Sequence, residues 1–152
     1  MLEGRHYQIA YVTNDAVAAA ERFRARADVR QETLTESKIE VSTPAGPATL
    51  HNKLALIWVG DVQYEFIEPV GYSPLYSPTI AQDGSLRLHH VAMRIDDWDD
   101  FRGRVARQSF PLVMEGAYGE LKFLYLDARP LLGHYLEYLY APEAVWTGMG
   151  GR

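Results

Sequence analysis

The sequence predicts an α+β fold built from two βαβββ modules, and two observations support this prediction. Residues 8–15, Gln-Ile-Ala-Tyr-Val-Thr-Asn-Asp, are matched about eighty residues later by residues 90–97, His-Val-Ala-Met-Arg-Ile-Asp-Asp. Both stretches alternate like a strand and end on an acidic residue suited to begin a helix. Each is followed about fifty residues later by a glutamate inside an apolar run, first Glu65 and then Glu137. A repeat of this kind indicates two copies of one structural unit.

The first module is predicted to span residues 1–69. Its helix follows Asn14 or Asp15, either of which can cap the helix N-terminus. Residues 60–61, Gly-Asp, are typical of a tight turn between two strongly apolar strands. The strands are predicted, in order, at residues 6–13, 29–41, 50–59 and 62–69.

Residues 70–86 are rich in Pro, Gly and Ser and are predicted to link this module to the second, residues 87–140. The second helix is expected to begin near Asp96 or Asp97, and residues 116–119 are expected to form a turn. The strands of this module are predicted at residues 88–95, 111–115, 121–126 and 134–140.

Composition excludes several classes of protein. The chain has 152 residues, 47% of them hydrophobic, which suits one compact domain or two small modules that share a core. A net charge of -5 argues against a nucleic-acid partner, and the absence of cysteine excludes disulfides and thiolate metal sites. No apolar run reaches membrane-spanning length, so we expect a cytoplasmic protein with no membrane partner. The glycine-rich tail, residues 141–152, is expected to be frayed.

Strand alternation predicts which polar side chains share a face. It places His6 and Gln8 together on the first strand, and His90 and Arg94 together on its counterpart. The opposite, aliphatic face of the second strand must cover the following helix. His90 and Arg94 are therefore expected to point away from that helix.

Glu65 and Glu137 each occupy the middle of an apolar strand. Burying a carboxylate is costly unless a cation or hydrogen-bond donors compensate its charge. Two such glutamates at matching places in a duplication favour one shared cation as the explanation.

The chain resembles the vicinal oxygen chelate superfamily, which includes glyoxalase I and methylmalonyl-CoA epimerase. The resemblance covers residues 6–140 and is closest to the epimerase-like branch. It rests on the repeated βαβββ order together with Glu65-Phe-Ile-Glu-Pro69, the Ser-Pro pairs at residues 73–74 and 77–78, and Leu88-His-His-Val-Ala92. It implies that the two modules form a curved, cup-like mixed sheet around one divalent metal ion, and that the protein is a homodimer.

The resemblance also implies a set of four metal ligands. These are Gln8, Glu65, His90 and Glu137. An oxygen-rich set with one imidazole suits Zn, Ni, Co, Mn or Mg and does not choose among them. His6 is an alternative first ligand if the strand register shifts by two residues. Aligning Asp15 with Asp97 puts Gln8 opposite His90 and favours Gln8.

The activity that the resemblance implies is that of a divalent-metal-dependent isomerase, epimerase or lyase. Such an enzyme acts on a small-molecule substrate through a metal-stabilised enolate of an oxo-acid or thioester. Glu137, and after it Glu65, are the candidates for the catalytic base, while Arg94 is a candidate for binding a substrate carboxylate or phosphate.

Two other functions are compatible with the sequence. One is a metal-free protein that sequesters small molecules in an aromatic cup, with candidate residues Trp58, Tyr64, Phe123, Tyr125 and Tyr135. The other is an extradiol-type dioxygenase, which needs two His and one Glu around Fe(II) and therefore needs His6 in place of Gln8. His89 is expected on the outer face or in a loop, and Glu68 on the face opposite Glu65.

Overall fold

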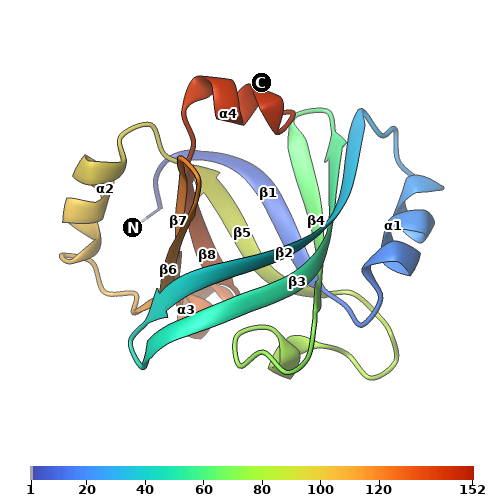
Figure 1. The fold of residues 1–152 in the computed structure, drawn as a ribbon, viewed down its shortest axis with the longest axis horizontal. Coiled ribbons are helices and arrows are strands. Elements are labelled where there is room, and N and C mark those ends of the chain that lie inside the picture. Colours follow the sequence, from blue (N-terminus) through green and yellow to red (C-terminus); the bar gives the residue numbers. More distant parts are fainter. Residues whose placement is uncertain (1) are drawn as a thin grey trace. The chain divides into compact units, whose positions relative to one another are not determined.

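The computed structural model describes residues 2–152 (Figure 1), and the α+β class predicted from the sequence is confirmed. Short helices are interspersed among the strands, and no helix within these residues is long and apolar enough to cross a membrane. The elements are β1 (Arg5–Val12), α1 (Ala16–Arg24), β2 (Gln31–Thr43), β3 (Gly46–Val59), β4 (Val62–Pro69), η1 (Ser77–Thr79), β5 (Arg87–Arg94), α2 (Trp98–Val105), β6 (Leu112–Tyr118), β7 (Leu121–Leu126), α3 (Arg129–Leu132), β8 (Tyr135–Tyr140) and α4 (Glu143–Gly148).

Contacts within the chain divide it into two compact units. Unit 1 consists of residues 2–7, Ile39–Thr49 and Val91–Arg152, and unit 2 consists of Gln8–Lys38 and Leu50–His90. Each unit takes residues from both predicted modules. Parts of β2 and β3 bring first-module residues into unit 1, and residues 87–90 of β5 bring second-module residues into unit 2. The modules defined by the repeat therefore differ from the units defined by contact, and the module boundaries stay a prediction.

Unit 2 is a small mixed sheet with one helix packed on it. β1 runs parallel to β4, with Gln8 opposite Gln63, and β4 runs antiparallel to β3. The turn between β3 and β4 contains Gly60 with φ +58°, a conformation that glycine adopts without strain. α1 lies beside β4 (Figure 1), and its Ala19 and Ala20 pack on the apolar face of the sheet. The buried residues of this core are Ala19, Ala20, Ala55, Ile57 and Phe66.

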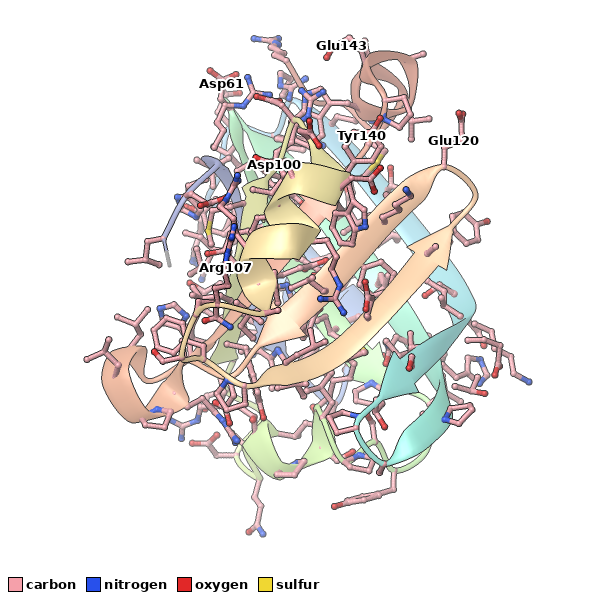
Figure 2. All side chains as sticks on the ribbon, turned by 90° about the vertical axis from the view of Figure 1, so that its left-hand side faces the viewer. Asp61, Asp100, Arg107, Glu120, Tyr140 and Glu143 are labelled. Carbon is pink, nitrogen blue, oxygen red and sulfur yellow. The ribbon has the colours of Figure 1, made fainter. Side chains whose placement is uncertain are left out.

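Unit 1 also has a helix packed on a sheet, in which three strand pairs are antiparallel. β2 pairs with β6, β6 with β7, and β7 with β8. Figure 2 shows α2, which carries Asp100, lying across the β6–β7 hairpin, whose turn carries Glu120. The buried residues of this core are Met93, Ile95, Trp98, Phe101, Val105, Leu124, Leu126, Ala128, Leu136 and Tyr138. In both units, therefore, one face of the sheet is covered by the helix that follows its repeat strand.

Both predicted helix starts are confirmed, and each uses an aspartate as its cap. The Asp15 carboxylate accepts a hydrogen bond from the backbone N–H of Ala18 at 2.9 Å. The Asp97 carboxylate accepts one from the backbone N–H of Asp100, also at 2.9 Å. Such a cap satisfies a backbone donor that has no partner within the helix.

The turn predicted at residues 116–119 is wrong in its position. β6 continues to Tyr118, so that the hairpin turns at residues 119–120. Gly116 lies inside the strand, where a Cβ would come within 2.7 Å of the Phe123 ring and 2.8 Å of the Val41 side chain. This glycine makes room for two packed neighbours and does not form a turn.

The frayed tail predicted for residues 141–152 is also wrong, because the chain forms α4 there. Trp146 is only 1% exposed, and its ring meets the edge of Tyr7 with 4.9 Å between centroids. The guanidinium of Arg94 lies over the same indole, 4.5 Å from its centroid. The buried Trp146 ring therefore attaches α4 to Tyr7 of β1 and Arg94 of β5.

The core of unit 1 predicts a specific response to alkali. Burial raises the pKa of Tyr138 from 10.0 to about 12. Above pH 10 the unfolded chain releases this proton before the folded chain does, so the free energy of unfolding should fall as pH rises from about 10 to 12. At about 1.4 kcal/mol per pKa unit, the full loss is about 3 kcal/mol. Below pH 10 the contribution is complete.

Urea unfolding at pH 9 and pH 11 tests this response in the wild type and in Tyr138→Phe. The Phe variant lacks the titrating group and should lose less stability between the two pH values. Equal losses in the two proteins would show that Tyr138 does not retain its proton in the folded state.

Candidate metal centre

Strand pairing in unit 2 brings the polar residues of β1 and β4 onto one face. In the parallel pair, Gln8 lies opposite Gln63, and Ala10 lies opposite Glu65. The other face of β4 carries Phe66, which packs against α1. Glu65 thus points away from the helix, as strand alternation predicts.

Three of the four predicted ligands lie together within unit 2. Nε2 of His90 is 3.3 Å from Oε1 of Gln8 and 3.4 Å from Oε2 of Glu65. His90 is fully buried, and Glu65 is only 8% exposed. An amide oxygen, a carboxylate and an imidazole therefore meet at one buried point.

Gln63 orients the first of these ligands. The side-chain amide of Gln8 donates a hydrogen bond to Oε1 of Gln63 at 2.7 Å, which leaves the Gln8 oxygen facing His90. Gln63 is itself buried. Gln63 was not among the predicted site residues, although its spacing of two residues from Glu65 places it on the same face.

The expectation that His89 lies on the outer face or in a loop is wrong. His89 is 1% exposed, and its Nδ1 lies 3.0 Å from Nδ1 of His90. Its Nε2 lies 3.0 Å from the backbone oxygen of Leu75, and its ring contacts Tyr76 with 4.7 Å between centroids. The segment that precedes η1 therefore covers this side of β5, which strand alternation alone could not reveal.

Glu137 occupies the corresponding face of the sheet in unit 1. It is buried on β8, with Tyr125 opposite it on β7. Tyr135 shares this face by alternation, and burial raises the pKa of its hydroxyl. The opposite face of β8 carries Leu136 and Tyr138, which pack in the core beneath α2. Glu137 thus points away from its helix, as Glu65 does in unit 2.

Arg94 is held by structural contacts in unit 1. Nη2 of Arg94 donates to the carboxylate of Glu143 at 2.8 Å, and the same group lies over the Trp146 ring. The ion pair with Glu143 and the contact with Trp146 attach α4 to β5. A role for Arg94 in binding substrate stays a prediction.

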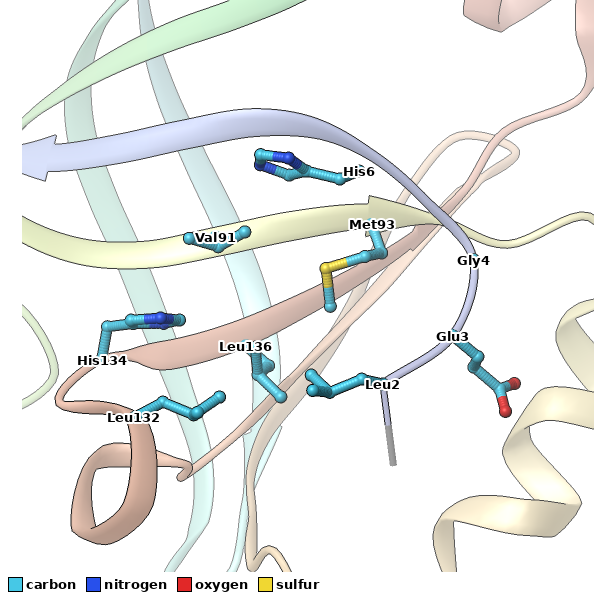
Figure 3. A pocket seen from close by; sticks show the side chains of 9 residues that line it. All are labelled: Leu2, Glu3, Gly4, His6, Val91, Met93, Leu132, His134 and Leu136. Carbon is cyan, nitrogen blue, oxygen red and sulfur yellow. The ribbon is translucent and has the colours of Figure 1, made fainter.

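His6, the alternative first ligand, is exposed and belongs to unit 1. It lines a hollow of about 360 Å³ together with His134, Val91 and Met93 (Figure 3). Gln8 contacts both Gln63 and His90 in unit 2. The observed contacts favour Gln8 over His6 as the residue beside His90.

The aromatic residues proposed to line a cup divide between the two faces of the sheets. Tyr64 packs against Phe23 of α1, with 4.7 Å between ring centroids, and so lies on the helix side. Trp58 lies opposite Gln63 in the β3–β4 pair and shares the face of Glu65. In unit 1, Phe123 and Tyr125 share the face of Glu137.

The residues present fit a divalent cation. A buried carboxylate needs a compensating charge, and oxygen ligands combined with one imidazole suit hard or borderline divalent ions. Glu65, His90 and Glu137 are each buried and each offer a ligand atom. A metal ion could therefore be held by this donor chemistry, and no sulfur ligand is required.

Comparison with known proteins identifies the family. The model of the Glyoxalase/Bleomycin resistance protein/Dioxygenase superfamily matches residues 7–125, and the chain belongs to this superfamily. No curated protein matches the sequence.

Solved structures show the same fold. Methylmalonyl-CoA epimerase from Mycobacterium tuberculosis has a TM-score of 0.68 and 17% identity, and the match covers 95% of this chain and 96% of that one. A hypothetical protein from Bacillus halodurans has a TM-score of 0.65 and 17% identity, with 91% and 95% covered. A Streptomyces coelicolor methylmalonyl-CoA epimerase variant in complex with 2-nitronate-propionyl-CoA has a TM-score of 0.64 and 15% identity, with 92% and 96% covered. At these identities, the similarity establishes the fold.

The geometry of β4 predicts different effects for its two glutamates. Glu65→Gln removes the buried negative charge beside His90 and should weaken Zn²⁺ binding at least about tenfold, or about 1.4 kcal/mol. Glu68→Gln is the matched control, because Glu68 accepts a hydrogen bond from Ala16 N–H and pairs with Lys53 on the helix side. Titration calorimetry with Zn²⁺ compares the two variants. Equal weakening in both would contradict the assignment of Glu65 as a ligand.

Proposed function

We propose that this protein is a divalent-metal-dependent isomerase, epimerase or lyase that acts on a small oxo-acid or thioester. The observation that supports this most strongly is the buried Glu65 carboxylate facing His90 and Gln8 in unit 2. Burying a carboxylate within an apolar strand costs free energy, so core packing alone does not account for Glu65 at this position.

We propose Glu137 as the fourth ligand. It occupies the place in the second repeat that Glu65 occupies in the first, and it is likewise buried on the face away from the helix. A divalent ion held by Gln8, Glu65, His90 and Glu137 would supply electrophilic polarisation to two neighbouring oxygens of the substrate.

The reaction itself would be a proton transfer at the carbon next to a substrate carbonyl. A carboxylate of the chain takes the proton from carbon, and the electron pair moves towards the carbonyl oxygen to give an enolate. An isomerase or epimerase returns the proton to a different position or face, whereas a lyase expels a leaving group instead. Glu137 is the first candidate for this base and Glu65 the second.

The surroundings of Glu137 suit a small substrate with an apolar part. Phe123, Tyr125 and Tyr135 share its face and are all buried. Aromatic side chains of this kind exclude water and strengthen the electrostatic effect of nearby charges. A thioester substrate draws support from the similar epimerase structures, one of which is described in complex with methylmalonyl-CoA. We further propose that the enzyme is a cytoplasmic homodimer, on the basis of the family resemblance.

Exchange of a carbon-bound hydrogen with solvent tests this proposal directly. In D₂O, the zinc-loaded protein should introduce deuterium next to the carbonyl of a reactive 2-oxo acid or acyl thioester, as followed by proton NMR. Glu137→Gln keeps the size of the side chain but removes the base, so exchange should fall at least about a hundredfold.

Glu120→Gln, in the exposed β6–β7 turn, is the matched control and should exchange at the wild-type rate. Exchange that persists when Glu137→Gln and Glu65→Gln are combined would eliminate a carboxylate base. A protein with neither bound metal nor exchange would instead be a metal-free binding protein of the same fold.

A further inference from the structure

The start of β8 brings a guanidinium to the face of the sheet that carries Glu137 in unit 1. Tyr135 and Glu137 are two residues apart on this strand, so their side chains share a face and leave the strand about 7 Å apart. The guanidinium of Arg129 lies over the Tyr135 ring, 4.4 Å from its centroid. Tyr135 is buried, whereas 55% of the Arg129 side chain is exposed. Arg129 therefore lies on the exposed side of the aromatic surface next to Glu137.

Asp127 fixes the position of this guanidinium. Its Oδ1 accepts hydrogen bonds from the backbone N–H of Arg129 at 3.1 Å and from Nε of the same residue at 2.8 Å. Its Oδ2 accepts one from Nη2 at 2.7 Å. The hydrogen bonds from Arg129 hold the pKa of the Asp127 carboxyl below its ordinary value, so Asp127 is ionised at neutral pH. A guanidinium that is already held at two nitrogens loses little further freedom when it binds an anion.

The guanidinium of Arg129 keeps donors for a second acceptor. It carries five N–H groups, and Asp127 accepts from Nε and from one hydrogen of Nη2. Among the residues that the structure describes, no other acceptor bonds this guanidinium. Its Nη1–Nη2 edge presents two parallel N–H groups, whose geometry matches the two oxygens of a carboxylate. A ligand carboxylate can therefore bind Arg129 without displacing Asp127.

Arg94 and Arg129 differ in what their neighbours leave accessible. The Arg94 side chain is only 10% exposed, and its guanidinium is engaged by Glu143 and by the Trp146 ring. Arg129 is exposed, and the ring that supports it shares the face of Glu137. Burial raises the pKa of the Tyr135 hydroxyl, so this group is neutral at neutral pH and does not repel an anion. Arg129 is thus better placed than Arg94 to meet the anionic end of a substrate at Glu137.

We propose that Arg129 is a specificity-determining residue that binds a carboxylate of the substrate remote from the reacting carbon. This inference rests on the proposed function, because it takes Glu137 as the base that the reacting carbon approaches. The preferred substrate is then a small acid with a second carboxylate, a few bonds away from the carbon that loses its proton. Asp127 holds two nitrogens of the guanidinium, and the Tyr135 ring supports its charge through a cation–π contact.

Two oxo acids of equal length test this assignment. 2-Oxoglutarate and 2-oxopentanoate share the 2-oxo acid group and the exchangeable hydrogens at carbon 3, and only 2-oxoglutarate has a carboxylate at carbon 5. The zinc-loaded wild type should exchange the carbon-3 hydrogens of 2-oxoglutarate with a kcat/KM at least about tenfold higher, because a hydrogen bond between charged groups contributes this much to binding.

Arg129→Gln should lower kcat/KM for 2-oxoglutarate at least about tenfold. The loss should come from a higher KM with kcat unchanged, because the remote carboxylate is bound equally before and during proton transfer. The same variant should act on 2-oxopentanoate as the wild type does. A loss of equal size for both acids would reduce Arg129 to a structural role.

Arg102→Gln is the matched control. Arg102 also binds a carboxylate, that of Glu115, through Nε at 2.9 Å and Nη2 at 3.0 Å. It belongs to α2, which packs on the face of the sheet opposite to Glu137. Its loss should leave kcat and KM for both acids unchanged.

Calorimetric titration with 2-oxoglutarate separates this inference from the proposed function. Arg129→Gln should bind at least about tenfold more weakly than the wild type, and Arg102→Gln should bind as the wild type does. A wild type whose binding depends on Arg129 but which exchanges no hydrogen would contradict the proposed function and support the role of Arg129. A wild type that binds 2-oxoglutarate and 2-oxopentanoate equally, or binds neither, would overturn the role of Arg129.

Discussion

Burying a carboxylate within an apolar strand costs free energy unless other groups compensate its charge, and unit 2 buries Glu65 in this way. The residues that contact the buried Glu65 side chain can compensate its charge. His90 approaches the carboxylate, Gln8 approaches His90, and Gln63 fixes the amide of Gln8. Replacing one of these residues with an apolar side chain removes a polar partner from the buried residue that it contacts.

In each unit, the helix packs on the face of the sheet opposite to the buried glutamate. α1 packs its alanines on Phe66 and Ile57 of unit 2, and α2 packs Trp98 and Phe101 on the core of unit 1. Because side chains alternate along a strand, covering one face with a helix leaves the opposite face for polar groups. The same physical reason places Glu65 in one unit and Glu137 in the other on the face away from the helix.

Periodicity predicted much of this from sequence, because alternation and helix capping are local properties. The strand faces of Glu65 and Glu137 and the caps at Asp15 and Asp97 follow from neighbouring residues alone. The burial of His89 depends on Leu75 and Tyr76, which fold back from a segment without regular pattern. The packing of Trp146 and the strand position of Gly116 likewise depend on contacts with residues distant in sequence. Such contacts leave no periodic signal.

The most direct test of the metal centre is a crystal structure of the zinc-loaded protein with anomalous scattering measured at the zinc edge. We predict one strong anomalous peak about 2.0–2.3 Å from Nε2 of His90 and from oxygen atoms of Gln8, Glu65 and Glu137. A peak beside His6 and His134, or no peak near His90 in zinc-loaded crystals, would contradict the account.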